Sequence, residues 1–519
     1  FLPFFIKKEG QKYLNTWHGT PLKCLGKQDN SGYHNLGNVQ RNFIFSDLLL
    51  YPNQYMRNHM IEDYMLENLT DARCLMAGYP RNSVFFDHES KKTIFNQLKE
   101  SGLINESVEH VYAYMPTWRG TVSCVNKEMQ TIYTMFYLLE IEKRLADDEI
   151  LFVNLHPFVN DSIDYSVFKH ILPFPKQYET YEFLNVADVL ITDYSSVFYD
   201  FANTRRKIVL FTYDADEYFA DRGVYCSLNS LPFPKVETVR DLIAELRTPK
   251  NYDDSSFIEE YCSLDKYDIS KKILKSFLFD SKELEILEIP KNGKDNVLIY
   301  AGNMAKNGIT TSLLSLLNNI DLKKRNYFIT FTVNKVRRNK EEILKLPEGV
   351  NYIPMMGVMD ATILDKVLMI LYRCNLMPSK LMQKKFDKLY KYDIRRYYYD
   401  APFKNVIQFN GYEYKRILEF GRFDSNRIIF VHNNMVKEIE TRQNQHKKTL
   451  VYAYNTYDKV AIVTEDMMDP TMEFCYDKSR IRIANNTIDY QKIQEMGNSP
   501  IKYDDTTVCR YTAEELYEV

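Results

Sequence analysis

Residues 187–196, Ala-Asp-Val-Leu-Ile-Thr-Asp-Tyr-Ser-Ser, carry the clearest fold signal in this chain. The apolar half predicts a buried strand, and an amphipathic stretch follows the two serines, so we expect a strand that runs directly into a helix. At the start of such a helix, unpaired N–H groups and the positive end of the helix dipole bind phosphate oxygens, and serine hydroxyls add donors. Asp193, Ser195 and Ser196 are therefore candidate phosphate-binding residues.

The same alternation of strand and helix extends to both sides of this segment. The expected strands are 110–115, 150–155, 186–191 and 208–212, and the expected helices are 129–145 and 197–204. Short β-branched runs that alternate with amphipathic helices are typical of an α/β fold with a parallel sheet covered on both faces. Ligands of such sheets bind beyond the carboxyl ends of the strands. Thr117 and His156, which follow two of these strands, are therefore expected near the serines.

Two histidines are candidate catalytic groups. His18 stands in Trp17-His18-Gly19-Thr20-Pro21, and His156 stands in Leu155-His156-Pro157. Glycine and proline make stiff turns that come close to a ligand. With a pKa of about 6.5, an imidazole there can take a proton from an attacking hydroxyl. Together with the serines, the two histidines predict a phosphoryl-transfer site. A structural histidine is the alternative in each case, and for His432 both interpretations stay open.

Several motifs, in this order along about residues 8 to 280, resemble the CDP-glycerol glycerophosphotransferase family. They are the His18 motif, Gly-Tyr-Pro-Arg-Asn at 78–82, Tyr-Met-Pro-Thr-Trp-Arg at 114–119, and residues 187–214 with Arg222-Gly223. The family includes teichoic-acid glycerophosphate polymerases and related ribitol-phosphate and capsule enzymes. The resemblance implies a GT-B architecture, in which two Rossmann-like domains enclose the active site. His18 would come from one domain, and His156 and the serines from the other.

The resemblance also implies the reaction. Glycerol phosphate, or a related polyol phosphate, would pass from a CDP-polyol to a hydroxyl of a growing, lipid-linked teichoic acid or capsule polymer, with release of CMP; glycerol and ribitol stay open. His18 and His156 would be catalytic, and the substrate-binding residues would be Gly19, Thr20, Thr117, Arg119, Asp193, Ser195, Ser196 and Arg222. No cofactor and no metal ion are expected. The motif Asp214-Ala215-Asp216 is too short to favour a metal.

A further Rossmann-like domain is expected after the region that carries this resemblance. We expect part of an acceptor-side domain at 1–100, a CDP-polyol-binding domain at 101–280, a linker at 281–296 and a further domain at 297–519. In that last domain, strands expected at 297–302, 327–332, 405–409, 427–431 and 459–463, with the segment 483–489, resemble the N-terminal half of a retaining GT-B glycosyltransferase. Its nucleotide-sugar half is expected beyond Val519. The alternative is a module that only docks the acceptor or a membrane.

Composition limits the remaining interpretations. The net charge of −3 gives no basic field for nucleic acid, and eight scattered cysteines without a C-x-x-C pair predict reduced thiols in the cytoplasm. No apolar run reaches the roughly 18 residues of a membrane span, so we expect peripheral contact with the inner face of the cell membrane. Residues 380–399 predict a basic amphipathic helix that can lie on an anionic leaflet. A solvated helix face, or a helix that docks on the module before it, is the alternative.

Overall fold

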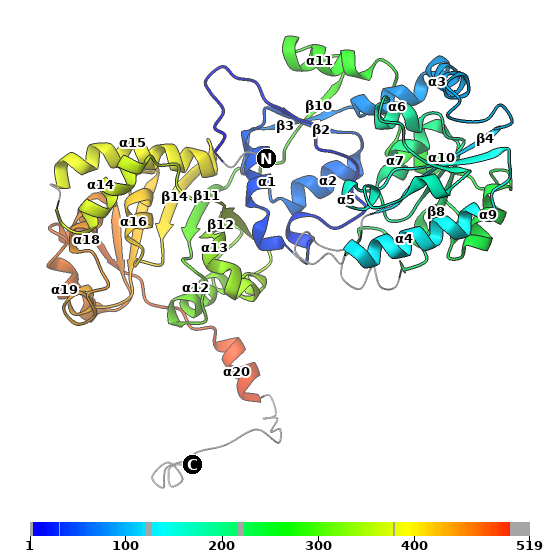
Figure 1. The fold of residues 1–519 in the computed structure, drawn as a ribbon. Helices are drawn as coiled ribbons and strands as arrows, with labels where there is room; N and C mark the ends of the chain where they lie inside the picture. Colours follow the sequence, from blue (N-terminus) through cyan, green and yellow to red (C-terminus); the bar gives the residue numbers. More distant parts are fainter. Residues whose placement is uncertain are drawn as a thin grey trace, which may run out of the picture. The chain divides into compact units, whose positions relative to one another are not determined.

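A computed structural model describes residues 4–30, 32–117, 119, 127–215, 223–376 and 379–498. The chain forms two compact units (Figure 1). The first unit consists of Phe1–Asn296, Thr330–Arg337 and Asn351–Lys404, and the second of Val297–Ile329, Arg338–Val350 and Asn405–Val519. Within the described ranges, every helix is too short or too polar to cross a bilayer.

The first sheet lies in the N-terminal part of the chain. Its strands run in the order β1 (Leu14–Asn15), β2 (Leu48–Tyr51), β3 (Arg73–Met76) and β10 (Glu285–Glu288). The first three are parallel, and β10 runs antiparallel to β3. The expected linker at 281–296 is therefore not only a connection, because its middle residues complete this sheet. The accompanying helices are α1 (Gly37–Phe45), α2 (Gln54–Asp63) and α11 (Ile269–Phe279). Helix α3 (His88–Glu100) packs instead against strands of the second sheet.

The second sheet has six parallel strands in the order β6-β5-β4-β7-β8-β9. They are β4 (His110–Met115), β5 (Glu149–Val153), β6 (Ile171–Pro173), β7 (Val189–Thr192), β8 (Lys207–Phe211) and β9 (Lys235–Val236). Chain order therefore reverses between β4 and β7, the arrangement of a Rossmann sheet, whose ligands bind at that reversal. The predicted α/β class is confirmed, and the short edge strands β6 and β9 are additions to it.

Both faces of this sheet are buried. One face packs Tyr112, Leu151 and Ile191 against Leu138 of α4 (Lys127–Glu142) and Leu242 of α9 (Val239–Leu246). The residues that alternate with them in β4 and β7 face the opposite layer, which includes α7 (Val197–Phe201) and α10 (Ser255–Tyr261). Strands covered on both sides need apolar residues at every position, which explains the continuous apolar runs of the sequence. The short helices α5 (Pro157–Asn160) and α6 (Thr180–Leu184) lie in the connections.

The third sheet has seven strands in the order β13-β12-β11-β14-β15-β16-β17, which is again a Rossmann-like order. The strands are β11 (Asp295–Tyr300), β12 (Arg325–Thr332), β13 (Val350–Met355), β14 (Phe403–Gln408), β15 (Asn426–Val431), β16 (Lys459–Ile462) and β17 (Ile481–Ile483). Helices in this part of the chain are α12 (Gly308–Asn318), α13 (Val333–Val336), α16 (Tyr414–Phe420), α17 (Met435–Lys437), α18 (Lys447–Thr456), α19 (Met468–Met472) and α20 (Tyr490–Asn498). All five predicted strands form, and β13 and β17 were missed.

Two helices of the first unit pack against each other: α14 (Ile363–Arg373) and α15 (Ser379–Tyr398). The rings of Tyr372 and Phe386 meet edge to face with centroids 5.0 Å apart. Phe386 and Tyr390, the apolar side of the predicted basic helix, are buried. The apolar face of α15 is therefore buried within the protein, as the alternative of a docked helix predicts.

Candidate active site

The first candidate catalytic residue, His18, lies in a tight turn directly after β1. Asn15 Oδ1 accepts a hydrogen bond of 3.0 Å from the Trp17 backbone N–H, and Trp17 has a positive φ of 53°. Such a conformation is unfavourable for a non-glycine residue and persists where the surroundings hold it. Here the indole of Trp17 packs against Phe43 and Tyr64, and the centroids of the Trp17 and His18 rings lie 4.2 Å apart. The imidazole is thus held by packing on an otherwise strained turn.

Gly19 brings this turn against the serine pair. Its φ is +145°, and a Cβ at this position would lie 3.0 Å from Arg81 Nη2 and 3.5 Å from Ser196 Oγ. The position therefore needs glycine for both its backbone angle and its close neighbours. The structure thus places the residue after His18 directly beside Ser196.

The serine hydroxyls lie at the start of α7, after the carboxyl end of β7. Val197 N–H approaches Ser195 Oγ at 3.5 Å, and Ser196 makes no side-chain cap. Both serines are half-buried. Neither hydroxyl is engaged in a short capping hydrogen bond, so binding a ligand oxygen would cost the helix little.

Arg81, in the motif Gly-Tyr-Pro-Arg-Asn, lies at the site although no role was predicted for it. Its Nη2 lies 2.8 Å from Asp200 Oδ2, and its guanidinium lies over the rings of Tyr79 and Tyr181 at 4.9 Å each. Burial, and then the positive charge of Arg81, lower the pKa of His18 below its ordinary value. His18 is therefore neutral near pH 7, which is the form that can accept a proton.

Thr117 and Asp193 join the loops that follow β4 and β7. Asp193 is buried, and its Oδ1 accepts hydrogen bonds from the backbone N–H of Thr117 at 2.7 Å and of Tyr194 at 2.5 Å. The Thr117 hydroxyl is buried and has no hydrogen-bond partner among the described residues. Since buried hydroxyls are usually paired, this one is a candidate donor to a ligand at the strand reversal.

Arg119 lies between two carboxylates. It contacts Asp193 Oδ2 at 2.7 Å, and it binds Asp214 through Nε at 2.6 Å and Nη2 at 2.9 Å. These ion pairs fix the loops after β4, β7 and β8 together, so the structure gives Arg119 and Asp193 a positioning role. Their direct contact with substrate stays a prediction. Asp216 of the Asp-x-Asp motif lies outside the described residues.

The remaining predicted residues are placed less decisively. His156 is exposed after β5, and its carbonyl accepts the first backbone hydrogen bonds of α5. Thr20 is buried, and its hydroxyl accepts a hydrogen bond of 2.9 Å from Asn53 Nδ2, which indicates support of the His18 turn. Arg222 lies outside the described residues. Gly223, which follows it, accepts a hydrogen bond of 3.0 Å from the Cys24 backbone N–H, so this segment runs beside the His18 motif.

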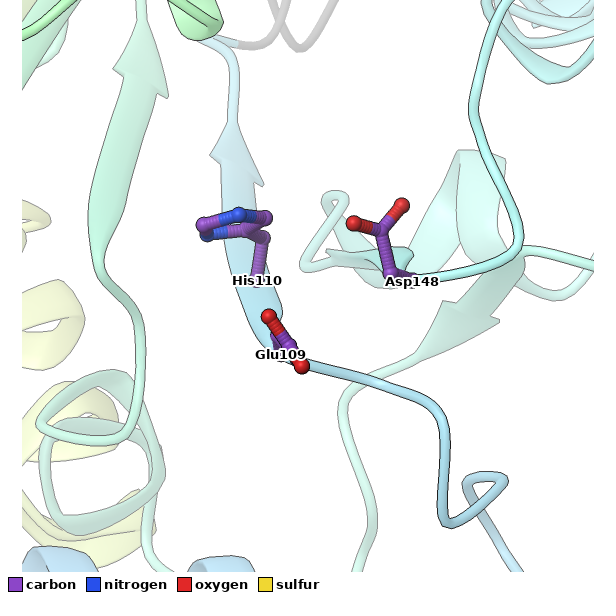
Figure 2. Close-up of side chains that lie close together, drawn as sticks. All are labelled: Glu109, His110 and Asp148. Carbon is purple, nitrogen blue, oxygen red and sulfur yellow. The ribbon is translucent and has the colours of Figure 1, made fainter.

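One group of side chains with metal-ligand spacing lies at the amino ends of the strands of the six-stranded sheet, opposite the candidate site (Figure 2). Glu109, His110 and Asp148 offer ligand atoms that all lie within 4.8 Å of one another. The backbone N–H groups of Glu109 and His110 both donate to the Asp148 carbonyl. These residues precede or begin β4 and β5, whereas the candidate site follows the ends of the strands, so the group takes no part in that site.

A known protein family matches the N-terminal part of this chain. The family described as CDP-Glycerol:Poly(glycerophosphate) glycerophosphotransferase matches residues 1–278. The chain belongs to this family. The matched region contains the His18 turn, the six-stranded sheet and the serine pair, and it ends before the seven-stranded sheet. Membership therefore concerns the part of the chain that holds the candidate site.

The relatives of this chain that carry names are transferases and polymerases of teichoic acid synthesis. The chain is 31% identical over 294 residues to a teichoic acid poly(glycerol phosphate) polymerase of Bacillus spizizenii, covering 53% of this chain and 72% of that protein. A teichoic acid glycerol-phosphate transferase of Staphylococcus aureus is 30% identical, with the same coverage. The chain spans only 41% of a polymerase of Staphylococcus epidermidis, at 30% identity. The solved wall teichoic acid polymerase TagF is 25% identical with a TM-score of 0.45, covering 53% of this chain and 69% of that one.

The proximity of Arg81 to His18 predicts a measurable titration shift. In Arg81→Gln we expect the pKa of His18 to rise, because a positive charge that opposes protonation is removed. Arg81→Lys keeps the charge and should leave the pKa close to that of the parent protein. NMR titration of the His18 imidazole measures both, and equal midpoints in the parent and Arg81→Gln proteins would assign the lowered pKa to burial alone.

Proposed function

We propose that this protein transfers glycerol phosphate from CDP-glycerol, or a closely related polyol phosphate from its CDP-polyol, to a hydroxyl of a growing teichoic-acid-type polymer. The observation that carries the proposal is the close approach of the His18–Gly19 turn to Ser196 where chain order reverses between β4 and β7. A base and a set of phosphate donors thereby meet where a Rossmann sheet binds its ligand. A donor screen with several CDP-polyols, following CMP release with and without acceptor, tests the proposal and separates glycerol from ribitol.

His18 acts as the general base in this mechanism. Its neutral imidazole takes the proton from the acceptor hydroxyl as the oxygen attacks the β-phosphorus of the donor. The new bond joins the acceptor oxygen to that phosphorus, and the bond to the oxygen shared with CMP breaks in line. The lowered pKa of His18 supports this role, because a base must be unprotonated before it can act.

The phosphate oxygens are held at the reversal of the sheet. Ser195 and Ser196 donate their hydroxyls, and backbone N–H groups at the start of α7 add donors. The buried Thr117 hydroxyl, without a partner among the described residues, is assigned as a further donor. His156, after the neighbouring strand β5, is assigned to the charge that develops on departing CMP. Phosphoryl transfer depends mainly on positioning and charge stabilisation, which fixed donors supply.

The acceptor is proposed to be polymeric and lipid-linked, and the enzyme to act in the cytoplasm at the inner face of the cell membrane. The names of relatives, teichoic acid poly(glycerol phosphate) polymerases, support a polymeric acceptor. A capsule polymer and a CDP-ribitol donor are the alternatives within the same chemistry. A relative named for poly(ribitol-phosphate) synthesis, 27% identical over 246 residues, keeps ribitol in the donor screen.

Replacing the proposed base tests the mechanism directly. His18→Ala should lower turnover by roughly 100-fold or more while donor affinity stays within about a few-fold, because the base acts in the transition state. CMP release and calorimetric binding of CDP-glycerol are the measurements. His88→Ala, an exposed histidine at the start of α3, is the matched control and should keep parental turnover. Parental turnover in folded His18→Ala would refute the assignment.

Removing the serine hydroxyls tests the phosphate site. The double variant Ser195→Ala and Ser196→Ala should weaken donor binding, since each hydrogen bond to a charged oxygen contributes about 1.5 to 3 kcal/mol. Ser255 and Ser256 form a second, exposed serine pair at the start of α10, so their double alanine variant is a matched control. If the two double variants bind CDP-glycerol equally well, the diphosphate lies elsewhere.

The seven-stranded sheet favours a second function, that of the acceptor-side half of a glycosyltransferase. Chain order reverses there between β11 and β14, and the loops after these strands meet: a Cβ on Gly302 would lie 2.5 Å from Asn410 Nδ2. Such a crevice is a ligand position in Rossmann sheets. His432, in contrast, is buried with Nε2 2.7 Å from the Phe409 carbonyl oxygen, which supports its structural interpretation. The alternative, a module that only docks the acceptor, uses the same crevice without chemistry.

Sugar transfer by the chain itself distinguishes these ideas. A glycosyltransferase of this architecture holds its nucleotide sugar on a further domain, so residues 1–519 should transfer no sugar from UDP- or GDP-sugars while CMP release persists. Radiolabelled nucleotide sugars offered with acceptor polymer provide the measurement. Sugar transfer by these residues would show that the second module already contains a complete donor site.

A further inference from the structure

Asp265 is a buried carboxylate that has no part in the proposed mechanism. It lies in the connection between α10 and α11 and is only 7% exposed. Burial, the largest influence, raises the pKa of Asp265 to about 6, and hydrogen bonds from Asn203 and Asn82 oppose this rise. A buried carboxylate is costly unless it is hydrogen-bonded, so the partners of Asp265 show what it holds in place.

Two of these partners belong to the Gly-Tyr-Pro-Arg-Asn motif. Asp265 Oδ1 accepts a hydrogen bond of 2.8 Å from the Tyr79 backbone N–H, and Oδ2 accepts one of 3.0 Å from Asn82 Nδ2. A Cβ on Gly78 would lie only 2.3 Å from Asp265 Oδ1, so the motif needs glycine there to pass this carboxylate. Arg81 therefore stands between two residues that Asp265 binds.

The third partner connects Asp265 to the helix that follows the serines. Asn203, in the turn after α7, donates its Nδ2 to Asp265 Oδ2 at 2.9 Å and to the Asp200 carbonyl at 2.9 Å. Asn82 Nδ2 also donates to Asp200 Oδ1, at 3.0 Å. Asp265 thus joins the Gly-Tyr-Pro-Arg-Asn motif to α7 on both sides of Asp200.

The guanidinium that this arrangement holds borders the serine pair. Arg81 Nη2 and Ser196 Oγ lie 3.0 Å and 3.5 Å from one point, the position that a Cβ on Gly19 would take. Arg81 Nε is buried and has no hydrogen-bond partner among the described residues. A guanidinium is a planar fork of donors that matches phosphate oxygens, but only when its orientation is fixed. The position of residues 79–82 therefore decides whether Arg81 can meet a phosphate at the serines.

We propose that Asp265 is a positioning residue for the transfer reaction: its carboxylate fixes the backbone around Arg81, so that the guanidinium meets the diphosphate of the CDP-polyol donor. The inference rests on the proposed function. Asp265 acts here through Arg81 and makes no contact with the donor itself. Its loss should therefore weaken donor binding and leave the chemical step largely intact.

Asp254 provides a matched control. It is 5% exposed, directly precedes α10, and forms an ion pair of 2.7 Å with Lys250. The variant Asp254→Asn therefore removes a similarly buried carboxylate without releasing the segment that carries Arg81. A general loss of stability would appear in both aspartate variants, whereas a loss of positioning would appear only in Asp265→Asn.

Steady-state CMP release from CDP-glycerol tests the proposal, with the full chain at pH 8, well above the pKa of Asp265. Asp265→Asn should raise KM for the donor by about tenfold and leave kcat within about a few-fold, because an amide replaces one of two accepting oxygens with a donor and Arg81 loses its support. A smaller folded fraction would instead lower kcat and leave KM unchanged. Asp254→Asn should keep the parental KM.

The Arg81→Gln background shows whether the effect passes through the guanidinium. Adding Asp265→Asn to Arg81→Gln should raise KM no further, since residues that act as one unit are not additive. Asn203→Ala, at a half-buried position, should raise KM in the same direction, and it keeps the test valid if Asp265→Asn does not fold. Circular dichroism establishes which variants are folded.

Parental KM in the folded Asp265→Asn and Asn203→Ala variants would overturn the proposal. So would a full further rise in KM when Asp265→Asn is added to Arg81→Gln, because Asp265 would then act independently of Arg81. The absence of CMP release from every CDP-polyol in the parent protein is a different result: it would overturn the proposed transferase function, and this inference with it.

Discussion

The candidate site depends on one buried carboxylate, that of Asp200 in α7. It accepts hydrogen bonds from Arg81 and Asn82 of the Gly-Tyr-Pro-Arg-Asn motif and from the hydroxyl of Tyr181. A buried charge is costly unless it is paired and hydrogen-bonded, so this cluster has little freedom to rearrange. Because Arg81 in turn lies beside Gly19, the carboxylate that belongs to the serine helix also determines where the His18 turn can lie.

The two arginines near the strand ends consequently differ in what they can do. Arg119 forms ion pairs with two carboxylates, Asp193 and Asp214, so the protein itself already compensates its positive charge. Arg81 shares the single carboxylate of Asp200 with two neutral donors, and its guanidinium lies beside the serine and histidine motifs. Arg81 is therefore the better source of positive potential for the diphosphate of the proposed donor, whereas Arg119 mainly holds the loops that carry Thr117 and Asp193 in place.

The central strands of the sheet that carries the site were predictable because burial on both faces requires continuous apolar runs in the sequence. The expected strand 110–115 coincides with β4, and the residues predicted beyond the strand ends do follow them. Edge strands such as β9, with two residues, are too short for any periodicity to show. The importance of Arg81 was equally hidden, because its partners come from α6 and α7, far away in the sequence, and only tertiary packing joins them.

The α14–α15 pair shows that periodicity does not predict whether an apolar helix face is buried. The basic residues of α15 were visible in the sequence, and its apolar residues suggested a face for lipid, yet Phe386 and Tyr390 are buried in the protein. The apolar pattern of α14 is the same whether its face meets protein or lipid, since helical periodicity records only that a face is apolar. Which of two adjacent amphipathic helices keeps its apolar side exposed is decided by packing. Tyr372 of α14 packs against Phe386 of α15, while Ile363 and Ile370 on the opposite side of α14 stay exposed.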